Sequence, residues 1–159
     1  MELWELLAIR CGVTAVIGSG GKTGLMEQLA SELRQRGTVL LCTTTKMWLP
    51  SPEMISTSAR EAKKALGERG FTYLGRKDES LGKLLPPDFS GWETMADFML
   101  VEADGAAGRP LKAHAPWEPV LPEGRKQTIC VVGASGIGKP ISLAAHRPEI
   151  FSRLCGAET

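Results

Sequence analysis

The fold is decided by the stretch from Val13 to Leu29, which reads VTAVIGSGGKTGLMEQL. Residues 14–17 are uncharged and mostly β-branched, as in a buried strand. A glycine-rich turn follows, and apolar residues then recur at the spacing of an amphipathic helix. These residues are Leu25, Met26, Leu29, Ala30 and Leu33. A strand that turns tightly into a helix predicts an α/β fold, here a three-layer P-loop-type domain with a mainly parallel sheet.

The glycine-rich turn has the composition of a phosphate-binding loop. Such a turn directs several backbone N–H groups, and the positive end of the helix dipole, at one point. Lys22 would neutralise the outer phosphates and Thr23 would offer a hydroxyl to Mg²⁺. The expected nucleotide-binding residues in this loop are Gly18, Ser19, Gly20, Gly21, Lys22, Thr23 and Gly24.

This loop is shorter than the usual G-x-x-x-x-G-K-[ST], because Val16 stands where the first glycine would be. In that respect GSGGKT is similar to the G-T-N-G-K-T turn of the Mur ligase family, which also binds ATP phosphates. The alternative is a glycine turn that only reverses the chain. The strand, the Gly-Lys-Thr sequence and the amphipathic helix follow one another directly, which favours phosphate binding.

Composition narrows the class of protein. The 159 residues predict one domain over 1–159. Nineteen basic and 18 acidic residues give a net charge of +1, which offers no electrostatic case for nucleic acid or an anionic membrane. No apolar run approaches the ~20 residues of a membrane span. The first ten residues lack the basic start of a signal peptide, and four scattered cysteines indicate reduced thiols, so we expect a cytoplasmic protein.

A second strand is expected over residues 38–44. The short crossover implies that it runs parallel to the first strand, so both carboxyl ends meet at the ligand-binding edge of the sheet. Thr43, Thr45 and Lys46 lie at that end. We take Thr43 as a strand residue and predict that Thr45 and Lys46 contribute to the site, Thr45 to nucleotide binding and Lys46 to catalysis.

Residues 98–101, reading FMLV, form a further buried strand that ends in acids, as a Walker B strand does. A carboxylate there could hold Mg²⁺ opposite Thr23, or orient a water for attack on the γ-phosphate. Glu102 and Asp104 are both candidates for the metal and for catalysis, and the sequence leaves open which of them binds the metal. The alternative is a solvated strand end.

A proline-rich segment follows over residues 106–122 and carries Arg109, Lys112, His114 and Glu118. Its prolines predict a fixed path over the surface. Lys112 is the residue of this segment that we assign to catalysis, whereas a lone surface histidine such as His114 is expected to be idle.

Several other elements are predicted. The first helix after the loop should end near Arg36, with Gly37 as its cap, and Ser58 should cap a helix over residues 56–67. Cys42 and Cys130 are expected in buried strands. Trp48 and Trp92 are expected in partly buried packing, with stacking on a base as the alternative for either. The remaining expectations are helices over 2–10 and 141–154, strands over 71–74 and 127–132, and a surface excursion over 76–87.

A second glycine-rich stretch, GASGIGKP over residues 133–140, also resembles a phosphate loop. Pro140 follows its lysine and has neither hydroxyl nor N–H, and fewer than 20 residues remain to build a nucleotide-binding unit. We therefore interpret this stretch as a plain strand-to-helix turn.

Six ordered motifs resemble the YqeC-type family of accessory factors of selenium-dependent molybdenum hydroxylases. They are IGSGGKTGLM, TTTKMWLP, VEADGA, PLKA, EPVLP and HRPE. Three features depart from the family pattern. Gly24 stands where the family usually has Thr, Trp117 replaces a His before Glu118, and the family usually continues beyond the last motif, so the chain is short or lacks a C-terminal segment. The resemblance implies a molybdenum hydroxylase or a selenium donor protein as partner.

We therefore expect Mg²⁺-dependent binding of ATP or GTP, followed by hydrolysis or phosphoryl transfer, in the maturation of such a hydroxylase. Two alternatives stay open: a nucleotide-gated recruitment module without turnover, and a Mur-like ligase or small-molecule kinase. The sequence does not decide between ATP and GTP.

Overall fold

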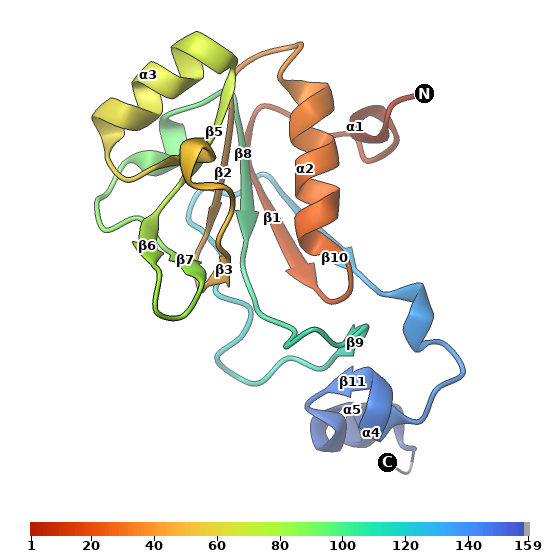
Figure 1. The fold of residues 1–159 in the computed structure, drawn as a ribbon. Coiled ribbons are helices and arrows are strands. Elements are labelled where there is room, and N and C mark those ends of the chain that lie inside the picture. Colours follow the sequence, from red (N-terminus) through yellow and green to blue (C-terminus); the bar gives the residue numbers. More distant parts are fainter. Residues whose placement is uncertain (158–159) are drawn as a thin grey trace.

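The computed structural model describes residues 1–157 and contains a six-stranded, all-parallel sheet with helices on both faces (Figure 1). The strand order is β10-β1-β8-β2-β5-β4. This arrangement confirms the predicted α/β class and parallel sheet. The strands are β1 (Gly12–Gly18), β2 (Val39–Thr43), β4 (Ile55–Ser56), β5 (Phe71–Leu74), β8 (Phe98–Glu102) and β10 (Gln127–Val131).

Alternating strand residues divide the core into two layers. Leu41 and Leu100 face α2 (Lys22–Leu33), whose buried side chains include Leu29 and Leu33. α1 (Leu3–Leu6) packs at the edge of the same layer. The opposite face of the sheet packs against α3 (Ala59–Arg69) and the short turn η2 (Trp92–Thr94). The period-two alternation of strands thus produces the two helical layers around one sheet.

The position of β8 creates the crevice of this fold. β8 pairs with both β1 and β2, although it follows them by more than 50 residues in sequence. The connection from β1 runs to β2 on one side, and the connection from β8 crosses to β10 on the other side. Where neighbouring strands diverge in this way, a crevice opens at their carboxyl ends, and ligands of α/β proteins bind there.

The excursion predicted over residues 76–87 is instead part of a second, antiparallel sheet. β6 (Arg76–Asp78) and β7 (Lys83–Leu85) form a hairpin that also pairs with β3 (Met47–Trp48). Leu84 and Met47 are buried where these strands cover the core. The prediction missed this sheet because strands of two or three residues are too short to show a period.

The C-terminal helix predicted over residues 141–154 is wrong as one element. The chain forms α4 (Ile141–Ala144), then β11 (Ala145–His146), then α5 (Pro148–Cys155). Arg147 adopts a left-handed backbone with φ of 62°, and the residue before a proline is disfavoured in a helix. β11 pairs with β9 (Leu111–Lys112), which ties this unit to the proline-rich segment below the sheet in Figure 1.

Other boundaries differ from the sequence prediction. The helix predicted over residues 2–10 is α1, which covers only Leu3–Leu6, because Ala8 has a φ of 50°. α2 ends at Leu33, and three turn residues precede Gly37. The capping of α3 by Ser58 is confirmed. Two further 3-10 turns are η1 (Pro52–Met54) and η3 (Ala134–Gly136), the latter in the second glycine-rich stretch.

Cys130, predicted to be buried, and Trp48, predicted to be partly buried, are exposed. Cys130 lies on the edge strand β10, and no element of the described chain covers that face. Trp48 is 68% exposed, whereas Trp92 is buried as expected. No helix within residues 1–157 has the length and apolar character needed to cross a bilayer.

We predict that Leu100→Ala lowers the free energy of unfolding by about 2–5 kcal/mol, because its fully buried side chain fills the layer under α2. Urea unfolding measures the change. Leu143→Ala is the matched control, since Leu143 is 63% exposed and should lose less than about 0.5 kcal/mol. Equal losses in the two variants would contradict the assigned core.

Asp97 generates a pH-dependent prediction. Hydrogen bonds from the backbone N–H and the hydroxyl of Thr38 lower the pKa of this carboxyl below 3.8. A lowered folded-state pKa gives stability that is present above the unfolded pKa and is lost as the pH falls through the folded one. Asp97→Asn should therefore be less stable than wild type at pH 6, and the difference should shrink below pH 4. A difference that stays constant down to pH 3 would contradict this role.

Candidate functional site

The glycines of the loop between β1 and α2 are required by close backbone packing. Gly18 and Gly20 have φ values of 92° and 72°, a region that side chains disfavour. A Cβ on Gly18 would lie 2.2 Å from the carbonyl oxygen of Val131, and one on Gly20 would lie 2.7 Å from the Cα of Gly133. The loop therefore packs closely against the end of β10 and the turn that follows it.

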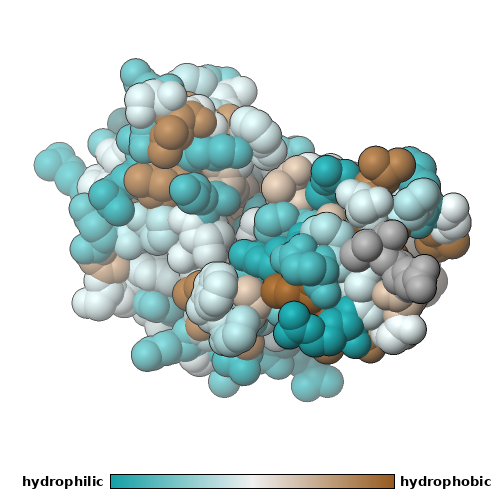
Figure 2. Space-filling view, turned by 90° about the horizontal axis from the view of Figure 1, so that it is seen from below, coloured by the Kyte–Doolittle hydropathy of each residue, from teal (hydrophilic) through white to brown (hydrophobic). Residues whose placement is uncertain are grey.

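A cleft of about 260 Å³ opens beside this loop. Residues 20–23 form one wall, residues 46–48 with Lys83 form the opposite wall, and Glu102 with residues 105–109 forms the floor and side. The first N–H groups of a helix have no partner within that helix, so those at the start of α2 are available to a ligand. Figure 2 views the molecule from below, the edge toward which β1 and β8 run in Figure 1, and shows a largely polar surface with scattered hydrophobic residues.

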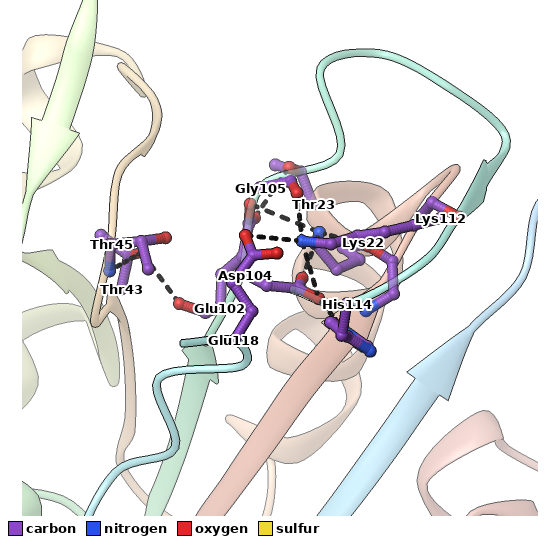
Figure 3. Close-up of polar contacts among 12 residues, drawn as sticks. Lys22, Thr23, Thr43, Thr45, Glu102, Asp104, Gly105, Lys112, His114 and Glu118 are labelled. Atoms are coloured by element: carbon purple, nitrogen blue, oxygen red, sulfur yellow. Dashed lines mark hydrogen bonds and ion pairs between the residues drawn. The ribbon is translucent and has the colours of Figure 1, made fainter. Parts of the chain in front are cut away.

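Lys22 and Asp104 form the central contact of the site (Figure 3). The Lys22 Nζ donates to Asp104 Oδ1 at 2.7 Å and to the carbonyl oxygen of Gly18 at 2.7 Å. Both side chains are buried, with Lys22 6% exposed and Asp104 fully enclosed. The second carboxylate oxygen of Asp104 accepts from the N–H of Gly18 at 2.9 Å. Asp104 therefore fixes both ends of the loop.

Asp104 has two further partners from the proline-rich segment. The Nε2 of His114 lies 2.6 Å from Asp104 Oδ2, and the Nζ of Lys112 lies 3.4 Å from the same oxygen. Burial acts to raise the pKa of Asp104, but the hydrogen bonds from Lys22, Gly18 and His114 outweigh it and hold the pKa below 3.8. The Asp104 carboxyl is thus ionised and fully engaged.

Glu102 has a different environment from Asp104. It is buried at the carboxyl end of β8, and its Oε2 lies 3.5 Å from the hydroxyl of Thr23. Burial raises the pKa of Glu102, Lys22 at 3.9 Å opposes that rise, and Asp104 adds to it. Glu102 lines the cleft and Asp104 does not, so Glu102 is the acid better placed beside a ligand.

Lys112 is enclosed rather than open to the cleft. Its side chain is 1% exposed, and its Nζ donates to the carbonyl oxygen of Gly105 and to Glu118 Oε1 at 3.0 Å. Glu118 also pairs with Arg147, the residue between β11 and α5. A line of ion pairs therefore runs from Lys22 through Asp104, Lys112 and Glu118 to the C-terminal unit.

Thr43, the last residue of β2, and Thr45, which follows that strand, lie apart from this cluster in Figure 3. The hydroxyl of Thr43 donates to the backbone carbonyl of Glu102 at 2.8 Å, which agrees with its expected role in the strand. The Oγ1 of Thr45 is buried without a hydrogen-bond partner among the described residues. Lys46 lines the cleft, but Thr45 does not.

The structure brings together only part of the predicted site. Gly20, Gly21, Lys22, Thr23, Lys46 and Glu102 line the cleft. Other loop atoms have internal partners: the Ser19 hydroxyl donates to the carbonyl of Pro110, and its N–H to that of Val131. Gly18, Ser19, Gly24, Asp104 and Lys112 do not line the cleft.

Sequence reasoning missed the role of His114 and the position of Lys83. His114 was expected to be idle, yet it contacts Asp104. Lys83 and the exposed ring of Trp48 form the opposite wall. The spacing from the acid to His114 carries no motif, and the position of Lys83 follows from the pairing of β3 with β7, so only the fold reveals these residues.

A second cavity of about 300 Å³ lies between α2 and β5. Its wall carries Arg34, Glu27 and Tyr73, and Glu27 already accepts a hydrogen bond from the Tyr73 hydroxyl. We favour the smaller cleft as the site, because it alone of the two joins the helix start to buried ionisable groups at the carboxyl ends of the strands.

We predict that Asp104→Ala lowers the free energy of unfolding by about 3–5 kcal/mol, because it removes the closest carboxylate from the buried ammonium of Lys22 and one of the two carboxylates beside the buried ammonium of Lys112. Urea unfolding measures the loss. The control is Glu68→Ala, which breaks the exposed pair with Lys64 and should change stability by less than about 1 kcal/mol. If both variants unfold at the same urea concentration, the buried network does not stabilise the fold.

Comparison with known proteins identifies the family. The profile described as YqeC protein matches residues 14–149. The chain is 32% identical over 166 aligned positions to the uncharacterized protein YqeC of Escherichia coli (strain K12). That alignment covers 91% of this chain, and this chain therefore spans about 60% of the length of the relative. No solved structure gave a significant match. The chain belongs to the YqeC family.

Proposed function

We propose that the protein binds a nucleoside triphosphate with Mg²⁺ in this cleft and hydrolyses it or transfers its γ-phosphoryl group. One observation carries the proposal. A buried lysine at the first position of α2 lies beside two acids that end a parallel strand, with its Nζ 2.7 Å from Asp104 and 3.9 Å from Glu102. Lysine, helix start and acids converge in this way where a protein neutralises phosphates.

The loop supports the proposal through its backbone. Gly20, Gly21 and the first residues of α2 line the cleft, so their N–H groups can donate to phosphate oxygens. Lys22 would exchange its contact with Asp104, in whole or in part, for the outer phosphates. In the free protein, the contacts of its Nζ with Asp104 and with the carbonyl oxygen of Gly18 hold the side chain beside the loop.

Thr23 and Glu102 fit a Mg²⁺ ion. They offer a hydroxyl and a carboxylate, the hard oxygen donors that Mg²⁺ prefers, and their oxygens lie 3.5 Å apart. No cluster of three His, Cys, Asp or Glu side chains within residues 1–157 forms an all-protein metal site. Mg²⁺ held with a nucleotide does not need one, since phosphates and water supply its other ligands. When bound, the ion would offset the charge that develops on the phosphates.

The two acids take separate roles in this proposal. Both oxygens of Asp104 have donors from the protein, so Asp104 positions Lys22 and the loop. Glu102 lines the cleft, and burial raises its pKa, so it is the residue to orient a water or an acceptor hydroxyl. Lys112 acts through Asp104 rather than on the ligand, and Lys46 lines the opposite wall.

The biological setting of the proposal comes from the family resemblance. It implies service in the maturation of a selenium-dependent molybdenum hydroxylase, with that enzyme or a selenium donor protein as partner. Two other modes share the same cleft. A recruitment module would bind nucleotide without releasing phosphate, and a ligase or kinase would form ADP only with an acceptor present. Phosphate release and ADP formation, measured with and without partner, separate these modes.

We predict that Lys22→Ala weakens binding of the Mg²⁺ nucleotide by roughly 10- to 150-fold, the loss expected for a charge-assisted hydrogen bond. Titration calorimetry with ATP and GTP, with and without Mg²⁺, measures the affinity and identifies the preferred base. Thermal unfolding verifies that the variant is folded.

Lys139→Ala is the matched control. Lys139 is exposed and ends the second glycine-rich stretch, which we interpret as a plain turn, so this variant should bind as the wild type does. Unchanged affinity of a folded Lys22→Ala variant for the Mg²⁺ nucleotide would contradict the proposal. So would an equal loss in both variants.

A further inference from the structure

The wall of the cleft opposite the loop presents an aromatic ring beside cations. Trp48 and Lys83 are direct partners in the antiparallel pairing of β3 with β7, so their side chains project from the same face of the small sheet. The Nζ of Lys83 lies 3.0 Å from the centroid of the indole ring. Trp48 nevertheless remains 68% exposed, so much of the ring is open to a ligand.

The charge of the cleft favours an anionic ligand. Lys46, Lys83 and Arg109 line it, and none of them forms an ion pair in the part of the chain that the structure describes. Glu102 is the one acid in the lining. Lys22, which Asp104 already neutralises, is the lysine required by the proposed nucleotide. The cations of the opposite wall are therefore in excess of that requirement.

The strand order places this wall relative to the nucleotide. β8 lies between β1 and β2, so Glu102 at the end of β8 stands between the loop after β1 and the residues after β2. Thr23 and Glu102, which would hold the metal, are on the loop side of the cleft, so a molecule bound at the wall of Trp48 and Lys83 would lie beside the proposed nucleotide.

We propose that Trp48, Lys83 and Lys46 form a subsite for a second small molecule, one that carries a planar ring and an anionic group. The ring stacks on the open part of the indole, and the anion pairs with the two lysines. This subsite rests on the proposed function and deepens it by naming the class of molecule that binds beside the nucleotide.

The experiment uses flavin mononucleotide and AMP as planar-ring phosphates of different ring size. Each is titrated into the protein alone and into protein saturated with Mg²⁺ and the non-hydrolysable analogue of ATP or GTP, whichever base calorimetry prefers. Riboflavin and adenosine carry the ring without the phosphate, and inorganic phosphate carries the anion without the ring. These three probes separate stacking from charge.

Trp48→Ala should weaken binding of flavin mononucleotide and AMP to the loaded protein by about 5- to 150-fold, the range for loss of one base–aromatic stack. Lys83→Met should weaken the two phosphates and leave riboflavin and adenosine within twofold. Trp117→Ala is the matched control, because Trp117 is 71% exposed beside a cation, Arg147, but lies outside the cleft lining.

Three results would overturn the subsite. Neither planar phosphate binds the wild type, Trp48→Ala binds them as the wild type does, or Trp48→Ala weakens the nucleotide analogue itself by the same factor. The third result would mean that the indole contacts the base of the nucleotide. Failure of the analogue to bind the wild type refutes the proposed function instead, and the titrations on unloaded protein then still decide the subsite.

Discussion

The buried ion pair between Asp104 and Lys22 is the constraint on which the site depends. Removing a carboxylate and an ammonium from water is costly unless each finds a close partner and further hydrogen bonds. Here the two groups meet at 2.7 Å, the N–H of Gly18 donates to the second oxygen of Asp104, and the carbonyl of Gly18 accepts from Lys22. The loop, the end of β8 and the start of α2 are thereby held in one arrangement.

The same ion pair connects the loop with the rest of the chain. Lys112 and His114 reach Asp104 from the proline-rich segment, and Glu118 links that segment to Arg147 before α5. A ligand that draws Lys22 away would leave Asp104 with Lys112 and His114 as its cationic and hydrogen-bonding partners. The negative charge of Asp104 would therefore have partners both with and without the ligand. Lys22 could then move without leaving an isolated buried charge.

Much of the fold could be predicted from sequence because its signals are local. The strand over residues 14–17, the helix after it and the strand before Glu102 each show their period within a few residues. Elements without a local period were missed. β3, β6 and β7 have only two or three residues each. The predicted helix over residues 141–154 is interrupted before Arg147, because residues 145–146 pair with β9 as strand β11 instead of continuing the helix.

The candidate site was predictable in its residue types and not in their roles. Gly-Lys-Thr and the acids after a buried strand indicated phosphate and metal chemistry. Nothing in the sequence separated the role of Glu102 from that of Asp104, because the two acids stand only two residues apart at the end of the same predicted strand. Burial and partners separate them: Asp104 is enclosed by donors, and Glu102 faces Thr23 and the cleft.

The sequence by itself determined that a strand, a glycine turn and a helix would present Lys22 and Thr23 at one edge of a parallel sheet. Backbone propensity and the periodicity of apolar side chains depend on residues that are close in sequence, so both can be recognised from the sequence alone. Only the tertiary structure decided that β8 inserts between β1 and β2, that Asp104 contacts Gly18 across 86 residues, and that Lys83 lies over Trp48. Those contacts depend on the packing of the whole chain, because each becomes favourable only when the core around it has formed.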